Sequence, residues 1–111
     1  MAAHDPQMLK GVLSLLLLEL CARHEDYGYA LVVRLQERGF SELAEGTVYP
    51  ALSRLEAHGL LKARLVRSAS GPARKYYTPT ASGAAELTRA RQAWSALVAA
   101  VASVRAEGSP S

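Results

Sequence analysis

Residues 46–80 read GTVYPALSRLEAHGLLKARLVRSASGPARKYYTPT, and the hydrophobic pattern changes once within this stretch. As far as Gly59 the apolar residues recur at helical spacing, and a glycine at this place is a typical helix stop. From Leu60 onward, basic and apolar residues alternate in two short runs, which the turn signal Ser-Gly-Pro separates. The pattern predicts a helix over about 45–58, followed by a hairpin with strands over 60–67 and 74–79. Pro50 is expected in the first turn of that helix, where its missing N–H costs no hydrogen bond.

Two helices are predicted before this stretch and one after it. The first spans about 6–23 and is apolar around most of its circumference, and the second spans about 27–38. The last begins after Thr80 and reaches about Arg105. The expected fold class is mainly α with a small β-hairpin: a winged helix-turn-helix in the order α-α-α-β-β, plus a long C-terminal helix. We expect the winged-helix domain over 6–80, the C-terminal helix over 81–106, and disordered tails at 1–5 and 107–111.

Positive charge is concentrated in one segment of the chain. The 111 residues carry a formal net charge of +3, but residues 54–75 hold six basic side chains against one acidic, whereas residues 1–53 are net negative. A local basic patch beside a helix-turn-helix is typical of a surface that binds a polyanion. Double-stranded DNA is therefore the expected partner, and the hairpin is expected to act as a basic wing.

The composition also argues against several other classes of protein. Cys21 is the single cysteine, and it has no metal-ligand spacing with His4, His24 or His58, so no disulfide, metal site or other cofactor is expected. No Gly-rich phosphate loop and no nucleophile beside a base can be recognised, which argues against an enzyme. No signal peptide and no membrane-spanning run are recognisable, so no membrane partner is expected and the expected location is the cytoplasm.

The third helix is expected to be the recognition helix, because the major groove admits one α-helix whose N-terminal residues reach base edges and phosphates. Arg54 could reach a phosphate or a base, or be a solvated helix residue. Tyr27 and Tyr29, at the start of the second helix, are further candidates, with packing against the core as the alternative. The residues expected to contact DNA from the recognition helix are Gly46, Thr47, Tyr49, Pro50, Ser53 and Arg54.

The wing is expected to supply most of the cations. Each phosphate that is neutralised adds about 0.9 to the slope of log affinity against log salt concentration. A solvated strand residue is the alternative for any single wing arginine, and their clustering beside the recognition helix favours DNA contact. The residues expected to bind DNA from the wing are Arg64, Arg67, Arg74, Lys75 and Tyr76.

The C-terminal helix carries an apolar seam whose residues recur at steps of three and four, the spacing of a helix that faces another helix. We expect a two-fold homodimer in which the first and last helices pack against their copies, with a helix folded back on its own domain as the alternative. Trp94 either packs in this seam or, together with Leu97, lines an effector pocket between subunits, where it could stack on a small aromatic or cationic compound. The residues expected at the dimer interface are Leu9, Leu13, Leu16, Leu87, Ala90, Trp94, Leu97, Val101 and Val104.

These segments together resemble the PadR family of transcriptional regulators. The resemblance covers about residues 8–105 and is carried by residues 27–31, 46–52, 54–56, 59–61, 71–80 and Gly83. It implies a bacterial or archaeal dimer, in most cases a repressor, that binds near-palindromic operators. In multidrug-responsive relatives a tryptophan of the C-terminal helix lines an inter-subunit ligand pore, and Trp94 falls at a similar place. Ser53 departs from the pattern, because many relatives have a basic or bulkier residue there.

The expected function is that of a dimeric, sequence-specific DNA-binding transcriptional regulator, a repressor released by a ligand or signal. In this interpretation the recognition helix lies in the major groove and the wing lies on the flanking backbone or in the minor groove. The alternative is a winged-helix protein–protein interaction module without specific DNA binding. A small-molecule carrier or enzyme built at the dimer seam is a third hypothesis, for which the sequence offers no catalytic residues.

Overall fold

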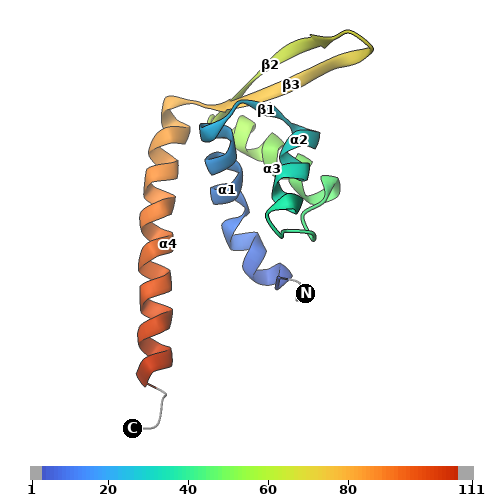
Figure 1. The fold of residues 1–111 in the computed structure, drawn as a ribbon. Coiled ribbons are helices and arrows are strands. Elements are labelled where there is room, and N and C mark those ends of the chain that lie inside the picture. The colour runs from blue at the N-terminus through green and yellow to red at the C-terminus, as the bar shows by residue number, and fades with distance from the viewer. Residues whose placement is uncertain (1–3, 108–111) are drawn as a thin grey trace.

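The computed structural model describes residues 4–107, and these residues form four helices and three strands (Figure 1). In chain order the elements are α1 (Pro6–Arg23), β1 (Asp26–Tyr27), α2 (Gly28–Glu37), α3 (Glu45–Ala57), β2 (Leu61–Ser68), β3 (Gly71–Pro79) and α4 (Ala81–Glu107). This is the winged helix-turn-helix with a long C-terminal helix that the sequence predicts. Within the described range, no helix is long and apolar enough to cross a membrane.

The helix boundaries follow from local chemistry. The Asp5 carboxylate accepts hydrogen bonds from the backbone N–H groups of Gln7 and Met8, which caps α1. Both α2 and α3 end in a glycine with positive φ, Gly39 at 94° and Gly59 at 74°. After each of them the chain folds back so that two N–H groups bond to carbonyls of the last helical turn, the pattern of a Schellman motif.

Pro50 lies deeper in α3 than the sequence suggests. Because α3 begins at Glu45, Pro50 is its sixth residue and falls in the second turn, so the expectation of a first-turn proline is wrong. The carbonyl of Gly46 consequently receives no N–H from residue 50. Gly46 has no neighbouring atom within 4 Å of where a Cβ would stand. This part of α3 is open to solvent.

The core lies between α1, α2 and α3 and is closed on one side by the sheet. Leu17 and Leu18 of α1 and Leu31 of α2 are fully buried, with Val48 of α3 against them. Tyr77 of β3 covers this cluster from the sheet side. The buried leucines of α1 point in more than one direction, which agrees with the apolar circumference of this helix in the sequence.

The wing belongs to a three-stranded antiparallel sheet with the order β1-β3-β2. The sequence predicts only the hairpin and misses β1, whose two residues pair with Tyr76 and Tyr77 of β3. It also starts the second strand too late, since β3 begins at Gly71 rather than at Arg74. The register is irregular between Val66 and Ser68, opposite Pro72. Proline cannot donate to a strand ladder, which accounts for an irregularity at this place.

Helix α4 leaves the domain at a closely packed junction. The Thr80 N–H donates to the carbonyl of Leu60, and its hydroxyl donates to the carbonyl of Gly59 at 2.5 Å. The same hydroxyl accepts the N–H of Gly83 at 3.0 Å, which caps α4. A Cβ at Gly83 would stand 1.9 Å from the carbonyl oxygen of Leu60. Only glycine allows α4 to start this close to the end of α3.

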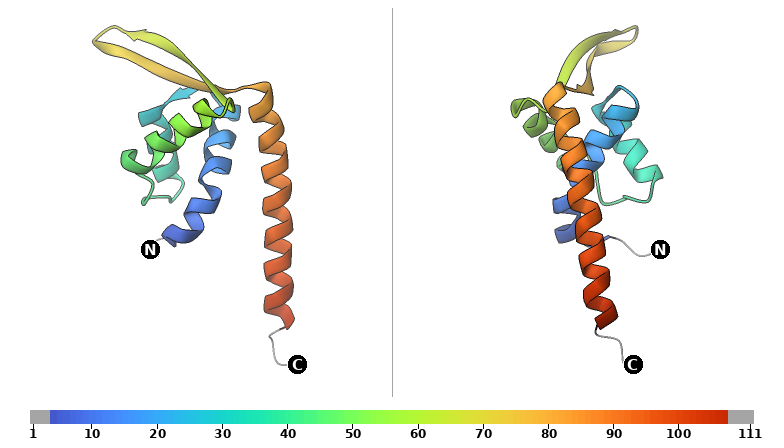
Figure 2. Two further views of the ribbon diagram at one scale, coloured as in Figure 1. Left: turned by 180° about the vertical axis from the view of Figure 1, so that it is seen from behind. Right: turned by 90° about the vertical axis from the view of Figure 1, so that its left-hand side faces the viewer.

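Beyond this junction α4 projects away from the domain (Figures 1 and 2). The radius of gyration is 16.4 Å, against about 13 Å for a compact chain of this length. Leu87 packs into the core and Arg91 pairs with Glu19 of α1, but residues 91–107 are exposed. Asp5 caps α1 and Glu107 is the last residue of α4, and the remainder of the expected tails, at 1–3 and 108–111, lies outside the described residues.

The junction predicts a contrast between two glycine variants. Gly83→Ala should lower the free energy of unfolding by at least about 1–3 kcal/mol, because its methyl group overlaps the Leu60 carbonyl. Gly11→Ala is the matched control, since Gly11 is exposed within α1 with nothing near its Cβ position, and it should gain about 0.5–1 kcal/mol. Chemical denaturation at one fixed protein concentration measures both. A Gly83→Ala protein as stable as the natural one would contradict the packing described.

Candidate nucleic-acid interface

Helix α3 has one buried side and one exposed side. Its apolar residues Val48, Ala51, Leu52 and Leu55 are buried against the core. The six residues that the sequence nominates for DNA contact are all exposed: Gly46, Thr47, Tyr49, Pro50, Ser53 and Arg54. The structure therefore brings these residues together on one solvent-facing surface.

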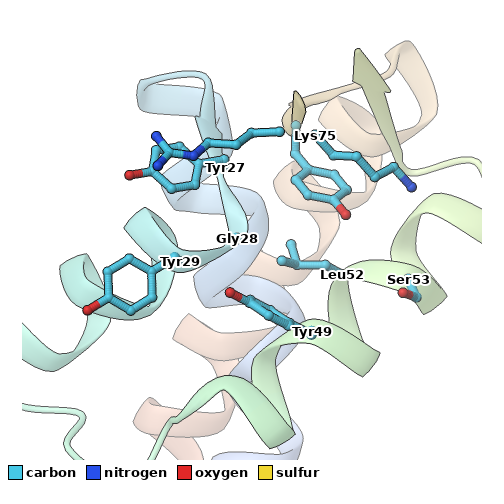
Figure 3. A pocket seen from close by; sticks show the side chains of 9 residues that line it. Tyr27, Gly28, Tyr29, Tyr49, Leu52, Ser53 and Lys75 are labelled. Carbon is cyan, nitrogen blue, oxygen red and sulfur yellow. The ribbon is translucent and has the colours of Figure 1, made fainter. Parts of the chain in front are cut away.

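Two hollows flank the exposed side of α3. The first, the wing-root hollow, has a volume of about 460 Å³ and lies between the start of α2, α3 and β3 (Figure 3). The second, the α1–α3 groove, has a volume of about 450 Å³. The wing-root hollow is lined by Tyr27, Gly28, Tyr29, Tyr49, Leu52, Ser53, Arg74, Lys75 and Tyr77. The α1–α3 groove is lined by Lys10, Leu13, Gly46, Thr47, Pro50 and Arg54.

Tyrosines form one wall of the wing-root hollow. The ring of Tyr49 lies so close to Gly28 that a Cβ there would stand 2.7 Å from it, so the lack of a side chain at Gly28 leaves room for the ring. Partial burial, with a smaller effect of Glu45, raises the pKa of Tyr49 above its ordinary value. Its hydroxyl, like that of an ordinary tyrosine, is protonated at neutral pH and can donate to an anion. Tyr29, on α2, is 53% exposed and lies on the same side of the hollow as Tyr49 (Figure 3).

Tyr27 has a different role from Tyr29. It is half-buried, its ring lies 5.3 Å from that of Tyr76, and the guanidinium of Arg74 lies 4.4 Å above it. A cation over an aromatic face is attracted to it and keeps its hydrogen-bond donors free at the edge. Tyr27 thus packs against Tyr76 and carries Arg74 over its ring, a contact that fits the packing alternative for Tyr27, whereas Tyr76 stays a predicted DNA contact of the wing.

Two of the wing cations are already paired with carboxylates. Arg64 makes two hydrogen bonds to Glu25, at 2.8 and 2.7 Å, and the Lys75 ammonium lies 2.8 Å from a carboxylate oxygen of Glu56. The hydrogen bond from Arg64 lowers the pKa of Glu25, and the hydrogen bond to Glu56 raises the pKa of Lys75. The sequence analysis missed both acidic partners, although Glu56 is the one acidic residue within the basic segment.

The other cations of this surface differ from that pair. Arg54 and Arg67 are exposed, and among residues 4–107 neither is paired with a carboxylate. Arg67 stands at the irregular step of the wing, close to its tip. The positive charge of residues 54–75 is therefore carried without a carboxylate partner by fewer groups, which are Arg54 of α3 and Lys62, Arg67 and Arg74 of the hairpin.

The residues nominated for the dimer interface fall into three groups. Leu9, Leu13 and Leu87 are only 4–6% exposed, so the protomer's own core covers them, and their assignment to a partner surface is corrected here. Leu16 and Ala90 are half-buried. The remaining four, together with Val98, form an exposed apolar face on α4: Trp94, Leu97, Val101 and Val104.

Cofactor-binding groups are scarce in the described part of the chain. No cluster of histidine, cysteine and carboxylate side chains between residues 4 and 107 has the arrangement of a metal site. Cys21 is buried in the core, and burial raises the pKa of its thiol to about 12. A thiol in that environment is neither a nucleophile nor a ready metal ligand at neutral pH.

Comparison with known proteins agrees with this geometry. Residues 17–89 match the family model described as the transcriptional regulator PadR-like family. A transcriptional regulator of Mycobacterium tuberculosis is 38% identical over 84 residues, which cover 76% of this chain and 77% of that protein. A PadR-like transcriptional regulator of Bacillus cereus is 38% identical with a TM-score of 0.80, over 88% of this chain and 95% of that one.

A further solved structure shows a relative bound to nucleic acid. It is Bacillus subtilis PadR in complex with operator DNA, which is 28% identical with a TM-score of 0.64 and matches 70% of this chain and 45% of that one. The family model spans more than half of the chain, and its neighbours are transcriptional regulators with the same helix and wing arrangement. The chain belongs to the PadR-like family of transcriptional regulators.

Proposed function

We propose that this protein is a dimeric, sequence-specific repressor that places α3 in the major groove of a near-palindromic operator. The observation that carries the proposal is the exposed side of α3, which presents hydroxyl groups and Arg54 beside a basic wing. The operator complex of Bacillus subtilis PadR supports this use of the fold. A ligand or signal then releases the repressor.

The chemistry of α3 suits contact with a polyanion and with base edges. Tyr49 and Thr47 are exposed hydroxyl donors for phosphate oxygens, and Ser53 can donate to or accept from a base. Arg54 is long enough to reach either a base or the backbone. The wing then lies along the flanking backbone or in the minor groove, with Arg67 and Arg74 among its free cations.

The ion pairs divide the wing cations by role. Arg64 and Lys75 bring a carboxylate with them, so binding a phosphate would require them to exchange one anion for another. Arg67 has no such competitor among the described residues. We therefore assign phosphate neutralisation in the wing mainly to Arg67 and Arg74.

The wing assignment predicts a specific loss of salt dependence. Fluorescence anisotropy with DNA from upstream of the gene, at several salt concentrations, should show tighter binding than with a scrambled duplex. Arg67→Met should reduce the slope of log affinity against log salt by about 1.8 for the dimer, about 0.9 per lost phosphate contact. Arg89→Met, which removes a cation that pairs with Glu86 on α4, is the charge-matched control and should leave the slope unchanged.

Two outcomes would contradict these assignments. Equal affinity for upstream and scrambled DNA would contradict a specific operator and favour the winged-helix protein–protein interaction module. A salt slope for Arg67→Met equal to that for Arg89→Met would show that Arg67 does not contact DNA.

The proposed dimer rests on the exposed face of α4. Trp94, Val98 and Val101 are 46–49% exposed, and Leu97 and Val104 are more so. These residues share one side of a helix roughly 40 Å long that projects beyond its own domain. A second copy placed about a two-fold axis presents the same face and covers both. Met8 of α1, 74% exposed, adds apolar surface for the same interface.

A charge within this face should separate the protomers. Val101→Asp buries an unpaired carboxylate in the proposed interface, and we expect a monomer by light scattering at a concentration where the natural protein is a dimer. Leu65→Asp is the control, because Leu65 is 71% exposed on β2 rather than on α4, and it should stay dimeric. A dimeric Val101→Asp protein would contradict an α4 interface.

The effector site is proposed between the two copies of α4, at Trp94 and Leu97. Trp94 is 46% exposed in the protomer, so its indole can face either the partner or a flat ligand. Because it is the single tryptophan, its emission reports on this place alone. Titration with planar aromatic compounds and cationic dyes should quench and shift the emission and weaken operator binding. Unchanged emission with all of them would argue against a pore of this kind.

A further inference from the structure

The α1–α3 groove has the character of a second DNA-contact surface, a conclusion that rests on the proposed function. The groove is bounded by Lys10 of α1 on one side and by Thr47 and Arg54 of α3 on the other. It shares no lining residue with the wing-root hollow, which takes Tyr49 and Ser53 from α3. The two hollows therefore lie along opposite edges of the exposed side of α3. In Figure 2, α3 lies between the wing and the N-terminal half of α1.

Both cations of the groove are free to bind an anion. Lys10 and Arg54 are exposed, and neither is paired with a carboxylate of residues 4–107. Two acidic residues on the neighbouring segments are engaged elsewhere, and a third, Glu45 at the start of α3, lies near Tyr49, which lines the other hollow. Asp5 caps α1, and Glu42 accepts the backbone N–H of His4. In the wing, by contrast, Arg64 and Lys75 are each neutralised by a carboxylate.

The Lys10 side chain leaves α1 in a direction that keeps it exposed to solvent in the proposed dimer. Glu19 of α1 holds Arg91 of α4, so the side of α1 at Glu19 is the side that faces α4. Lys10 precedes Glu19 by nine residues, which is about two and a half helical turns. The two side chains consequently leave α1 on opposite sides. A partner helix that packs against α4 does not cover Lys10.

We propose that the α1–α3 groove binds a backbone phosphate of the operator, held by the Lys10 ammonium and the Arg54 guanidinium, with the Thr47 hydroxyl as a further donor. A helix in the major groove has one sugar–phosphate strand along each of its edges. The wing-root hollow, with Arg74, meets one strand, and the α1–α3 groove meets the other. Lys10 is thereby a DNA-contact residue on α1, a helix that otherwise serves the core and the proposed dimer.

The test is a set of single variants of the full chain in the same salt titration. Lys10→Met should reduce the slope of log affinity against log salt by about 1.8 per dimer and raise Kd at 0.1 M salt by at least about tenfold. The loss should be the same for upstream and scrambled DNA, because a phosphate carries no sequence information. Arg54→Met should reduce the slope by the same amount. Circular dichroism checks that each variant is folded.

Arg89→Met is again the control. Arg89 is an exposed cation on α4 that lines neither hollow, and its removal should leave the slope within error of the natural protein. A folded Lys10→Met protein with the slope of Arg89→Met overturns the inference while operator binding by the natural protein still supports the proposed function. If the natural protein binds no DNA, both the phosphate site in the α1–α3 groove and the proposed function are wrong. If it binds upstream and scrambled DNA equally but Lys10→Met reduces the slope, the phosphate site is supported and the proposed sequence specificity is wrong.

Discussion

The hydrogen bonds of Thr80 determine how the two functional parts of this chain are arranged. Its backbone N–H and its hydroxyl donate to the carbonyls of Leu60 and Gly59, and the hydroxyl also accepts the N–H of Gly83. One residue thus joins the end of α3, the exit of the wing and the start of α4. Gly83 allows the contact, since a Cβ would overlap the Leu60 carbonyl. The direction of α4 relative to α3 is set here.

That direction matters because α4 is the proposed dimerisation helix and α3 is the proposed recognition helix. In a two-fold dimer, the angle and distance between the two copies of α3 depend on how each α4 leaves its own domain. Half-sites on B-DNA recur about one helical turn apart, and a small rotation at the junction would move the second α3 out of register. A closely packed junction would thus limit the half-site spacings that the proposed dimer can bind.

The sequence predicts the fold well because its strongest signals are local. Helical periodicity, Gly39 and Gly59 as helix stops and the Ser-Gly-Pro turn each act within a few residues, and they gave the order of helices and hairpin. Strand β1 was missed because two residues carry no period, and they become a strand only by pairing with β3. Pro50 was predicted in the first turn of α3 but lies in the second. The exposed side of α3 tolerates the loss of one backbone hydrogen bond, which a buried turn would not.

The candidate site was predicted only in outline for a similar reason. Exposure along α3 follows from its apolar period, and all six nominated residues are exposed. Which charges are free does not follow from the sequence, because the partners are distant along the chain: Glu25 lies 39 residues from Arg64, and Glu56 lies 19 from Lys75. Lys10 escaped notice for the same reason, since only the packing of α1 against α3 brings it to the groove.

The distribution of free positive charges affects how the protein could distinguish an operator from other DNA. If Arg54 and Lys10 hold phosphate, the side chains left to read bases on α3 are short: Ser53, with Gly46 and Pro50 around it. A single hydroxyl discriminates bases less than a bidentate arginine or asparagine does. Specificity would then depend on the spacing of two half-sites and on the sequence-dependent shape of the DNA between them. The junction at Thr80, which sets that spacing, would contribute as much to recognition as the exposed side of α3.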